Sequence, residues 1–465
     1  MEGMENNSFL GQEKVSSLMA KFAVPCVLSF MVSALYNIVD QIFIGNSELS
    51  TLGNAAIGVV FPVFILAQAF AWCSANGCAT YMNICQGKKM TDVAHKAVGT
   101  CLTLTIAISF ILMAVIFPFK VPFLQLFGAS ASNIDLAVEY LNLILGFMPT
   151  LILSNMVTTI ITADGSPNFS MMALLAGAGV NIVFDPIFIF GLHWGMTGAG
   201  LATIMGQITS CVIAFVYFRK PKTFRLHRQS FIPDWHIFGE MIKLGFSTFV
   251  TQISVLIITV LCNVTLVKYG ALSQYGVDIP IAVIGIATKV FTVLINIVVG
   301  MVLGCQPIIS YNMGAEHYGR IKKLYKLMLI CTIIVSLSFT LVFELAPHFI
   351  IGLFGVPTNI PNPEDYWIFA AKTFRIYLML VTFCCIVKLN SIFLQSVGRP
   401  VYALISSVIR DLACFAPLLV LLPMKLGIEG VLVAAPISDA IAIVVATIFM
   451  VKFMKSLPKQ SNALS

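Results

Sequence analysis

The sequence predicts an all-α polytopic membrane protein in which twelve transmembrane helices form two pseudo-symmetric six-helix lobes. Composition is the first reason, because 59% of the 465 residues are hydrophobic and only 10% are charged, with a mean hydropathy of +0.96. Soluble domains carry about 25% charged residues, so lipid must surround most of this chain. The spacing of the apolar runs and an internal repeat are the second and third reasons.

Apolar runs that can cross a bilayer, for which about 20 residues are needed, recur along the whole chain. Several are longer than this, so the helices are expected to tilt, and Pro25 and Pro62 are expected kink sites. The expected spans are 15–44, 53–83, 95–119, 135–162, 168–191, 196–218, 240–268, 280–311, 325–352, 368–395, 400–423 and 428–454.

The distribution of basic residues predicts the orientation of these spans. Eighteen of the 27 Lys and Arg residues fall in alternate loops and at the termini, whereas the opposite loops hold only Lys120, Lys268 and Lys425. The positive-inside rule then places both termini and the basic loop 219–230 in the cytoplasm, and the loop 355–366 outside. We expect a bacterial or archaeal plasma membrane. The net charge of +7 is explained by this pattern, and no nucleic-acid partner is expected.

The two halves of the chain resemble each other, which indicates an internal duplication. Each half has six spans, an even number, so both halves enter the membrane in the same sense. Parallel repeats of this kind are a transporter architecture with the substrate path at the repeat interface, although a duplicated scaffold without transport is the alternative. We expect an N-terminal lobe at 1–218, a cytoplasmic linker at 219–238 and a C-terminal lobe at 239–465. The collinear matches, at shifts of 227 to 233, are Gly58 with Gly285, Gly77-Cys78 with Gly304-Cys305, Gly87 with Gly314, Leu126-Phe127-Gly128 with Leu353-Phe354-Gly355, and Gly165 and Pro167 with Gly398 and Pro400.

Two acidic residues lie deep in the spans of the first half, where ionisable groups are costly and are functional candidates by default. Asp40 and Asp185 both lie roughly 8–9 Å below the outer end of their helices, at 1.5 Å per residue. Asn181 is one turn deeper than Asp185 on the same helix face, and Thr203 reaches a similar depth. Because no Lys or Arg of this half lies at that depth, these four residues predict a site for H⁺ or Na⁺. The alternative is that each acid only caps or bonds a neighbouring helix.

The second half does not repeat this acidic pocket but has intramembrane charges of its own. Internal ion pairing is one interpretation of these charges, and a second ion or substrate site is the other. The residues are Lys289, Lys388, Arg410, Asp411 and Asp439.

Motifs for chemistry at an active site are not present in the sequence. It has no G-x-x-x-x-G-K-[ST] phosphate loop, no H-E-x-x-H zinc motif and no G-x-S-x-G nucleophile motif. The twelve cysteines form no C-x-x-C pair and most lie inside apolar runs. We therefore expect a protein that is not an enzyme and that uses no cofactor other than H⁺ or Na⁺ as a coupling ion.

Four stretches resemble the multidrug and toxic compound extrusion (MATE) transporters, and the resemblance extends over essentially the whole chain. They are PCVLSFMVSALYNIVDQIFIG, NICQGKKMTD, ADGSP and NIVFDPIFIFG. The chain is most similar to the prokaryotic branch whose cation site lies in the N-terminal lobe. That resemblance implies a coupling site at Asp40, Asn181, Asp185 and Thr203, and a first span that bends near Pro25, with Tyr36 and Asn37 in the pocket. A sodium site in the C-terminal lobe is not implied, because spans seven and eight lack the acids of the other branch.

The resemblance implies a secondary antiporter that exports hydrophobic or cationic drugs in exchange for H⁺ or Na⁺ by alternating access. Expected partners are small organic cations or amphipathic drugs and membrane lipids, and the chain is expected to act as a monomer. The alternative is a flippase for a lipid-linked oligosaccharide from the same broad superfamily. A flippase needs a cationic cavity to hold pyrophosphate, and Lys289, Lys388 and Arg410 keep that alternative open.

Overall fold

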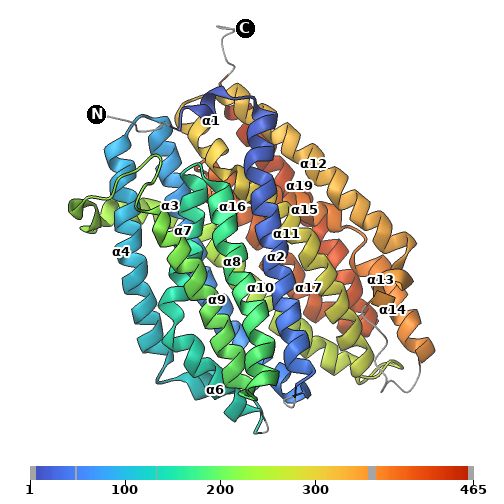
Figure 1. Ribbon diagram of the computed structural model, residues 1–465. Helices are drawn as coiled ribbons and strands as arrows, with labels where there is room; N and C mark the ends of the chain where they lie inside the picture. The colour runs from blue at the N-terminus through green and yellow to red at the C-terminus, as the bar shows by residue number, and fades with distance from the viewer. Residues whose placement is uncertain (1–6, 48–49, 132, 354–362, 459–465) are drawn as a thin grey trace. The chain divides into compact units, whose positions relative to one another are not determined.

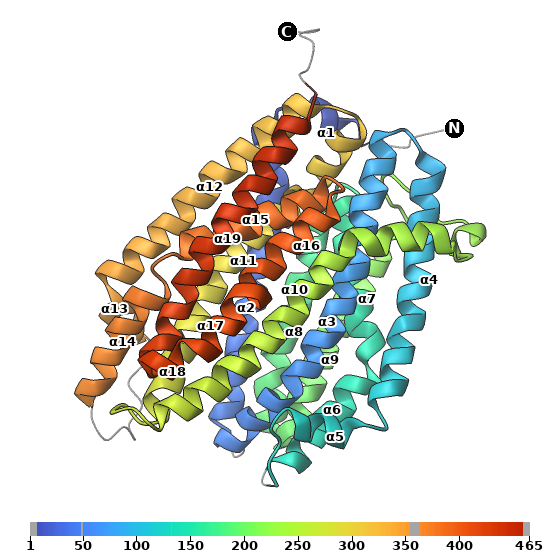
Figure 2. The same ribbon diagram turned by 180° about the vertical axis from the view of Figure 1, so that it is seen from behind.

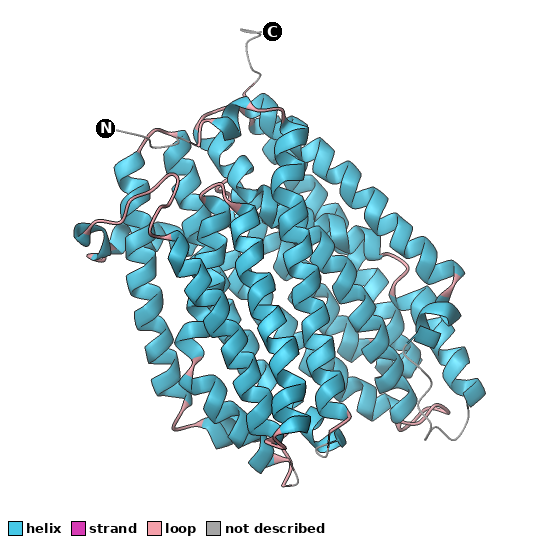
Figure 3. Cartoon of the chain, in the orientation of Figure 1, coloured by secondary structure: helices cyan, strands magenta, loops and turns pink. Residues whose placement is uncertain are grey.

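The computed structural model describes residues 7–47, 50–131, 133–353 and 363–458, and within these ranges every regular element is a helix (Figure 3). Ten helices are long and apolar enough to cross a membrane, and two bent helix pairs raise the number to twelve. The predicted all-α polytopic fold is confirmed. The elements of the first half are α1 (Phe9–Gln12), α2 (Val15–Gly45), α3 (Ser50–Gly87), α4 (Thr91–Ile116), α5 (Lys120–Leu126), α6 (Ile134–Gly146), α7 (Met148–Ala163), α8 (Pro167–Pro186), η1 (Ile187–Gly191) and α9 (Gly195–Tyr217).

The second half begins after a loop that contains one short helical turn. Its elements are η2 (Arg228–Phe231), α10 (Trp235–Gly270), α11 (Asp278–Gly314), α12 (Tyr318–Leu345), α13 (Pro347–Leu353), α14 (Pro363–Tyr377), α15 (Val381–Ser396), α16 (Pro400–Val408), η3 (Ile409–Phe415), α17 (Ala416–Leu421), α18 (Pro423–Leu426) and α19 (Ile428–Ser456). The chain forms two compact units, each made of three segments. The first unit comprises residues 1–253, 303–321 and 395–400, and the second comprises residues 254–302, 322–394 and 401–465. The lobe boundaries at 218 and 239 stay a prediction.

Two spans are broken, one in each half of the chain. The helices α6 and α7 meet at 54° and the helices α14 and α15 meet at 43°. A shift of 232 residues, within the range of the repeat, carries Phe147 at the first break onto Met379 at the second. By contrast, Pro25 and Pro62 both lie inside uninterrupted helices. The breaks therefore follow the duplication rather than these two prolines.

Glycines allow two helices of the first unit, α3 and α10, to cross at very close range. A Cβ atom on Gly77 would lie 2.1 Å from the carbonyl oxygen of Met241, and one on Gly245 would lie 1.9 Å from that of Cys73. Figure 2 shows α10 crossing α3 at this level. Any larger residue at either position would push the two backbones apart.

The glycine pair Gly87 and Gly314 shows the duplication directly. A Cβ on Gly87 would lie 2.9 Å from the carbonyl carbon of Gly314, and one on Gly314 would lie 3.1 Å from the Cα of Gly87. These two residues were matched by the internal repeat, so a position contacts its own repeat copy. Neither position could carry a side chain without moving the backbone of the other helix.

The segment that follows α9 is fixed to the rest of the first unit through Asp164, at the end of α7. The Asp164 carboxylate accepts hydrogen bonds from the Tyr217 hydroxyl at 2.6 Å, from the Lys222 backbone N–H at 2.7 Å and from the Thr223 backbone N–H at 2.9 Å. The Thr223 hydroxyl also donates to it. Burial raises the pKa of Asp164 above its ordinary value, although these hydrogen bonds act in the opposite direction. This carboxylate holds the linker in place.

Candidate functional site

The four residues predicted to bind a cation lie together in the first unit. Asp40 is on α2, Asn181 and Asp185 are on α8, and Thr203 is on α9. The helix α8 packs against both α2 and α9 (Figure 1). This packing brings the helices that carry the four residues together. They are 9%, 2%, 0% and 8% exposed, respectively.

The carboxyl groups of Asp40 and Asp185 lie close enough to interact directly, and Asn181 lies beside Asp185 without reaching hydrogen-bond geometry. Five buried polar atoms here have no hydrogen-bond partner, namely Oδ1 of Asp40, both oxygens of Asp185, and both Oδ1 and Nδ2 of Asn181. A buried polar atom without a partner is costly. So many in one place indicate a site that a ligand completes.

Two tyrosines border the acidic pair. Tyr36, one turn before Asp40 on α2, is half-buried and lies within electrostatic range of both carboxyls. Tyr140 on α6 is buried, lies next to Thr203 and is within range of the same two carboxyls. Tyr140 was not identified in the sequence, because a tyrosine in an ordinary apolar helix face carries no distinguishing signal. The two phenols raise the number of oxygen-bearing side chains around the pocket from four to six.

The other two residues predicted for the first-span pocket, Asn37 and Pro25, are not part of the acidic pair's surroundings in the same way as Tyr36. Asn37 is exposed and donates to the backbone carbonyl oxygen of Ser33 at 2.6 Å. Pro25 lies four turns before Asp40 and its carbonyl oxygen accepts a hydrogen bond from the Ser29 hydroxyl at 2.9 Å. Because proline has no N–H, α2 lacks one backbone hydrogen bond at this point. Whether the helix bends there stays a prediction.

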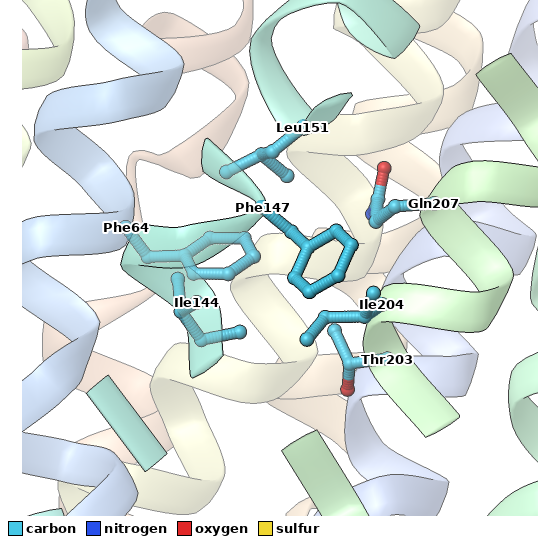
Figure 4. A pocket seen from close by; sticks show the side chains of 7 residues that line it. All are labelled: Phe64, Ile144, Phe147, Leu151, Thr203, Ile204 and Gln207. Carbon is cyan, nitrogen blue, oxygen red and sulfur yellow. The ribbon is translucent and has the colours of Figure 1, made fainter. Parts of the chain in front are cut away.

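A small cavity adjoins the pocket through Thr203. It is lined by Phe64, Ile144, Phe147, Leu151, Thr203, Ile204 and Gln207 (Figure 4). The space open to the centre of a water molecule is about 10 Å³, which is enough for about one water. Thr203 and Gln207, one turn apart on α9, supply its polar groups. A cavity of this size admits water or a proton and excludes a drug-sized molecule.

The chemistry of the pocket fits a monovalent cation or a proton. Carboxylate, amide and hydroxyl oxygens are the donors that hard cations prefer, and no Lys or Arg is among the described groups that act on either carboxyl. The described residues contain no group of three or more His, Cys, Asp or Glu side chains arranged to hold a metal. Residues Asp40, Asn181, Asp185 and Thr203 would hold the ion, and two adjacent carboxylates in a dry site cannot both remain ionised without one.

The second unit contains a separate and electrically balanced cluster of charges. Asp411 accepts from the Lys388 ammonium at 3.2 Å and from Arg410 at 2.8 Å, and Arg410 Nε donates to Asp439 at 2.9 Å. Two cations and two anions thus neutralise one another. The π-helical segment η3 carries Arg410 and Asp411, and Lys289 lies outside this cluster, exposed on α11.

The chain matches the family model MatE over residues 25–187 and 248–421. It is 24% identical over 443 residues to the multidrug export protein MepA of Staphylococcus aureus (strain MSSA476), with 95% of each chain covered. It is 24% identical over 393 residues to MepA of Staphylococcus haemolyticus, covering 84% of this chain and 81% of the relative.

Two solved structures have the same fold. One is an outward-facing conformation of a multidrug resistance MATE family transporter of the MOP superfamily, with a TM-score of 0.88, 21% identity, and 98% of this chain and 99% of that chain covered. The other is a MOP superfamily transporter from Pyrococcus furiosus, described as having a binding pocket of reverse polarity, with a TM-score of 0.89, 21% identity, and 99% and 100% coverage. The family model covers both halves of the chain, and the chain belongs to the MatE family of multidrug and toxic compound extrusion transporters.

Proposed function

We propose that this protein is a secondary antiporter that exports amphipathic drugs from the cell in exchange for H⁺ or Na⁺. The observation that carries the proposal is the Asp40–Asp185 pair, buried next to each other with three unpartnered carboxylate oxygens and without a counter-charge. Membership of a transporter family and similarity to proteins named for multidrug export support the choice of cargo.

The proposed coupling follows from the charge of the pocket. When both carboxylates are ionised, they repel each other and attract any cation that reaches them. A proton or Na⁺ that arrives from the outer side removes this repulsion and lets α2 move towards α8. The missing hydrogen bond at Pro25 is a weak point at which α2 can bend. Ion entry therefore drives the lobe between two shapes, and export of the drug follows from that change.

Efflux from proteoliposomes tests this proposal. The purified protein is reconstituted into liposomes that are loaded with a fluorescent amphipathic dye, and the liposomes are given a proton gradient in one series and a sodium gradient in another. We expect one of the two gradients to drive dye against its concentration and the other to have little effect. Empty liposomes and gradient-collapsing ionophores are the controls. If neither gradient moves dye faster than in empty liposomes, the antiport proposal is wrong.

The proposal includes an orientation in a bacterial or archaeal plasma membrane, with both termini in the cytoplasm. The predicted outer loop 355–366 lies largely outside the described residues, so Leu272, an exposed residue of the loop between α10 and α11, is a better probe. A membrane-impermeant thiol reagent should label Leu272→Cys in intact cells and label Gln229→Cys only after permeabilisation. The wild-type protein, whose twelve cysteines are free, gives the background. Labelling of Gln229→Cys in intact cells would contradict the orientation.

A further inference from the structure

The outer part of α11 has its polar side chains on the exposed face and its apolar side chains on the buried face. At 100° per residue, Gly285 and all the polar residues from 285 to 296 lie within an arc of about 100°. They are Gly285, Thr288, Lys289 and Thr292, which are exposed, and Asn296, which is half-buried. The opposite side of the helix is buried and consists of residues such as Val283, Ala287, Leu294 and Val298.

Lipid does not fit a helix face of this composition. A helix that faces lipid presents apolar side chains outward, because hydrocarbon cannot satisfy polar groups. On α11 the exposed face is the polar one, and it includes a full positive charge. Lys289 is eleven residues from the first residue of the helix, Asp278, or roughly 16 Å along the axis, which is beyond the reach of one lysine side chain to the headgroups. This face therefore lines water within the span.

Lys289 has no acidic partner among the described residues. Asp411 and Asp439, the acids far from the ends of the spans in the second unit, are bonded to Lys388 and Arg410. No ion pair among the described residues includes Lys289. An unpaired intramembrane cation is costly and indicates a functional site by default. The partner it lacks in the protein must come from what passes along the face.

We infer that Lys289 binds an anionic group of the transported compound, so that the cargo is selected for a carboxylate or similar anion on an amphipathic body. This inference rests on the proposed export function and narrows its substrate class from amphipathic drugs in general to zwitterions and amphipathic anions. Thr288 and Thr292 lie on the same exposed face as Lys289, and the Thr292 hydroxyl donates to the Thr288 carbonyl oxygen at 2.8 Å. An exposed ammonium repels a simple cation and pairs with a carboxylate.

A matched pair of dyes isolates the charge. Tetramethylrhodamine carries a free carboxylate, and its methyl ester is the same molecule without that charge. The purified full-length protein in detergent, where no membrane potential acts on the dyes, is titrated with each and binding is followed by fluorescence anisotropy. We expect the wild type to bind the carboxylate form about tenfold more tightly, as a charge-assisted hydrogen bond allows. Lys289→Met should reduce this ratio to about one, and Lys289→Arg should retain it.

Lys268→Met is the matched control, since it removes the same charge from the exposed end of α10, and its ratio should equal that of the wild type. Lys289→Cys should also react with a charged, water-soluble thiol reagent. An unreactive Cys at this position overturns the inference, as does a wild type that binds both dyes equally or binds neither, or a Lys289→Met variant that keeps the preference. Gradient-driven export of the carboxylate dye is measured in parallel. Its absence in the wild type refutes antiport alone and leaves the binding preference as evidence for an anion-selective site.

Discussion

Asp40→Asn and Asp185→Asn should each reduce gradient-driven export to the level of empty liposomes, while both variants are produced at close to the normal yield. The expected result follows from the geometry of the acidic pair. Each carboxylate is needed for the repulsion that an incoming ion relieves, so a neutral amide of the same shape removes the coupling. Folding should not suffer, because neither Asp185 oxygen has a hydrogen-bond partner to lose. Removing one of two adjacent buried charges should leave the melting temperature equal to or above that of the wild type.

Asp92→Asn is a suitable control because Asp92 is exposed in the first turn of α4. Glu at position 40 or 185 keeps the charge and should retain part of the activity. Wild-type export rates in both Asn variants, under a proton and under a sodium gradient, would show that the coupling site lies elsewhere. The charged cluster of the second unit would then be the leading candidate.

Asp411→Ala should give the largest loss of stability of any single substitution in the second unit, by about 3–5 kcal/mol, because it breaks a buried ion pair and leaves the other partner without its counter-charge. The Asp411 carboxylate accepts from both Lys388 and Arg410. Its loss leaves Lys388 as a buried cation with no partner, since Arg410 still has Asp439. Folded yield after detergent extraction, measured by size-exclusion chromatography, should fall to a small fraction of the wild type.

The double variant Lys388→Met with Asp411→Asn should recover much of that yield, because it removes one charge of each sign and leaves the Arg410–Asp439 pair in place. Recovery of this kind distinguishes charge balance from simple loss of packing. A normal yield for Asp411→Ala together with a changed ion dependence of export would contradict the structural role and indicate a second ion site.

Span positions were predictable from the sequence because hydropathy is the same physical quantity that determines them. The predicted span at 15–44 corresponds to α2 at Val15–Gly45, and the one at 428–454 corresponds to α19 at Ile428–Ser456. The breaks in two spans were not predicted. Pro149 lies just after the first break, at the start of α7, where proline fits well. The second break, at Leu378-Met379-Leu380, contains no residue that disfavours a helix, so only tertiary packing can cause it.

The candidate site was predictable to the extent that depth along a helix can be counted. Asp40 and Asp185 could be placed at one level from residue numbers alone, and the structure brings them together. Tyr140 could not be identified, because which face of α6 meets α9 depends on packing. The same is true of Lys289. The sequence grouped it with Lys388 and Arg410 as an intramembrane cation, and only side-chain exposure separates an unpaired lysine from a paired one.

The contact between Gly87 and Gly314 has a consequence for the origin of the chain. Before duplication, one sequence position must have met the same position of a second molecule, which is the mark of a self-complementary homodimer. In such a homodimer every substitution at the contact changed both subunits at the same time. Only glycine, which has no side chain, allowed the two helix backbones to lie so close together. Fusion of the two copies released them from that constraint, so that one half could keep a pair of buried acids while the other acquired an intramembrane lysine. Gly87 and Gly314 remain glycine in both halves, as their close contact requires.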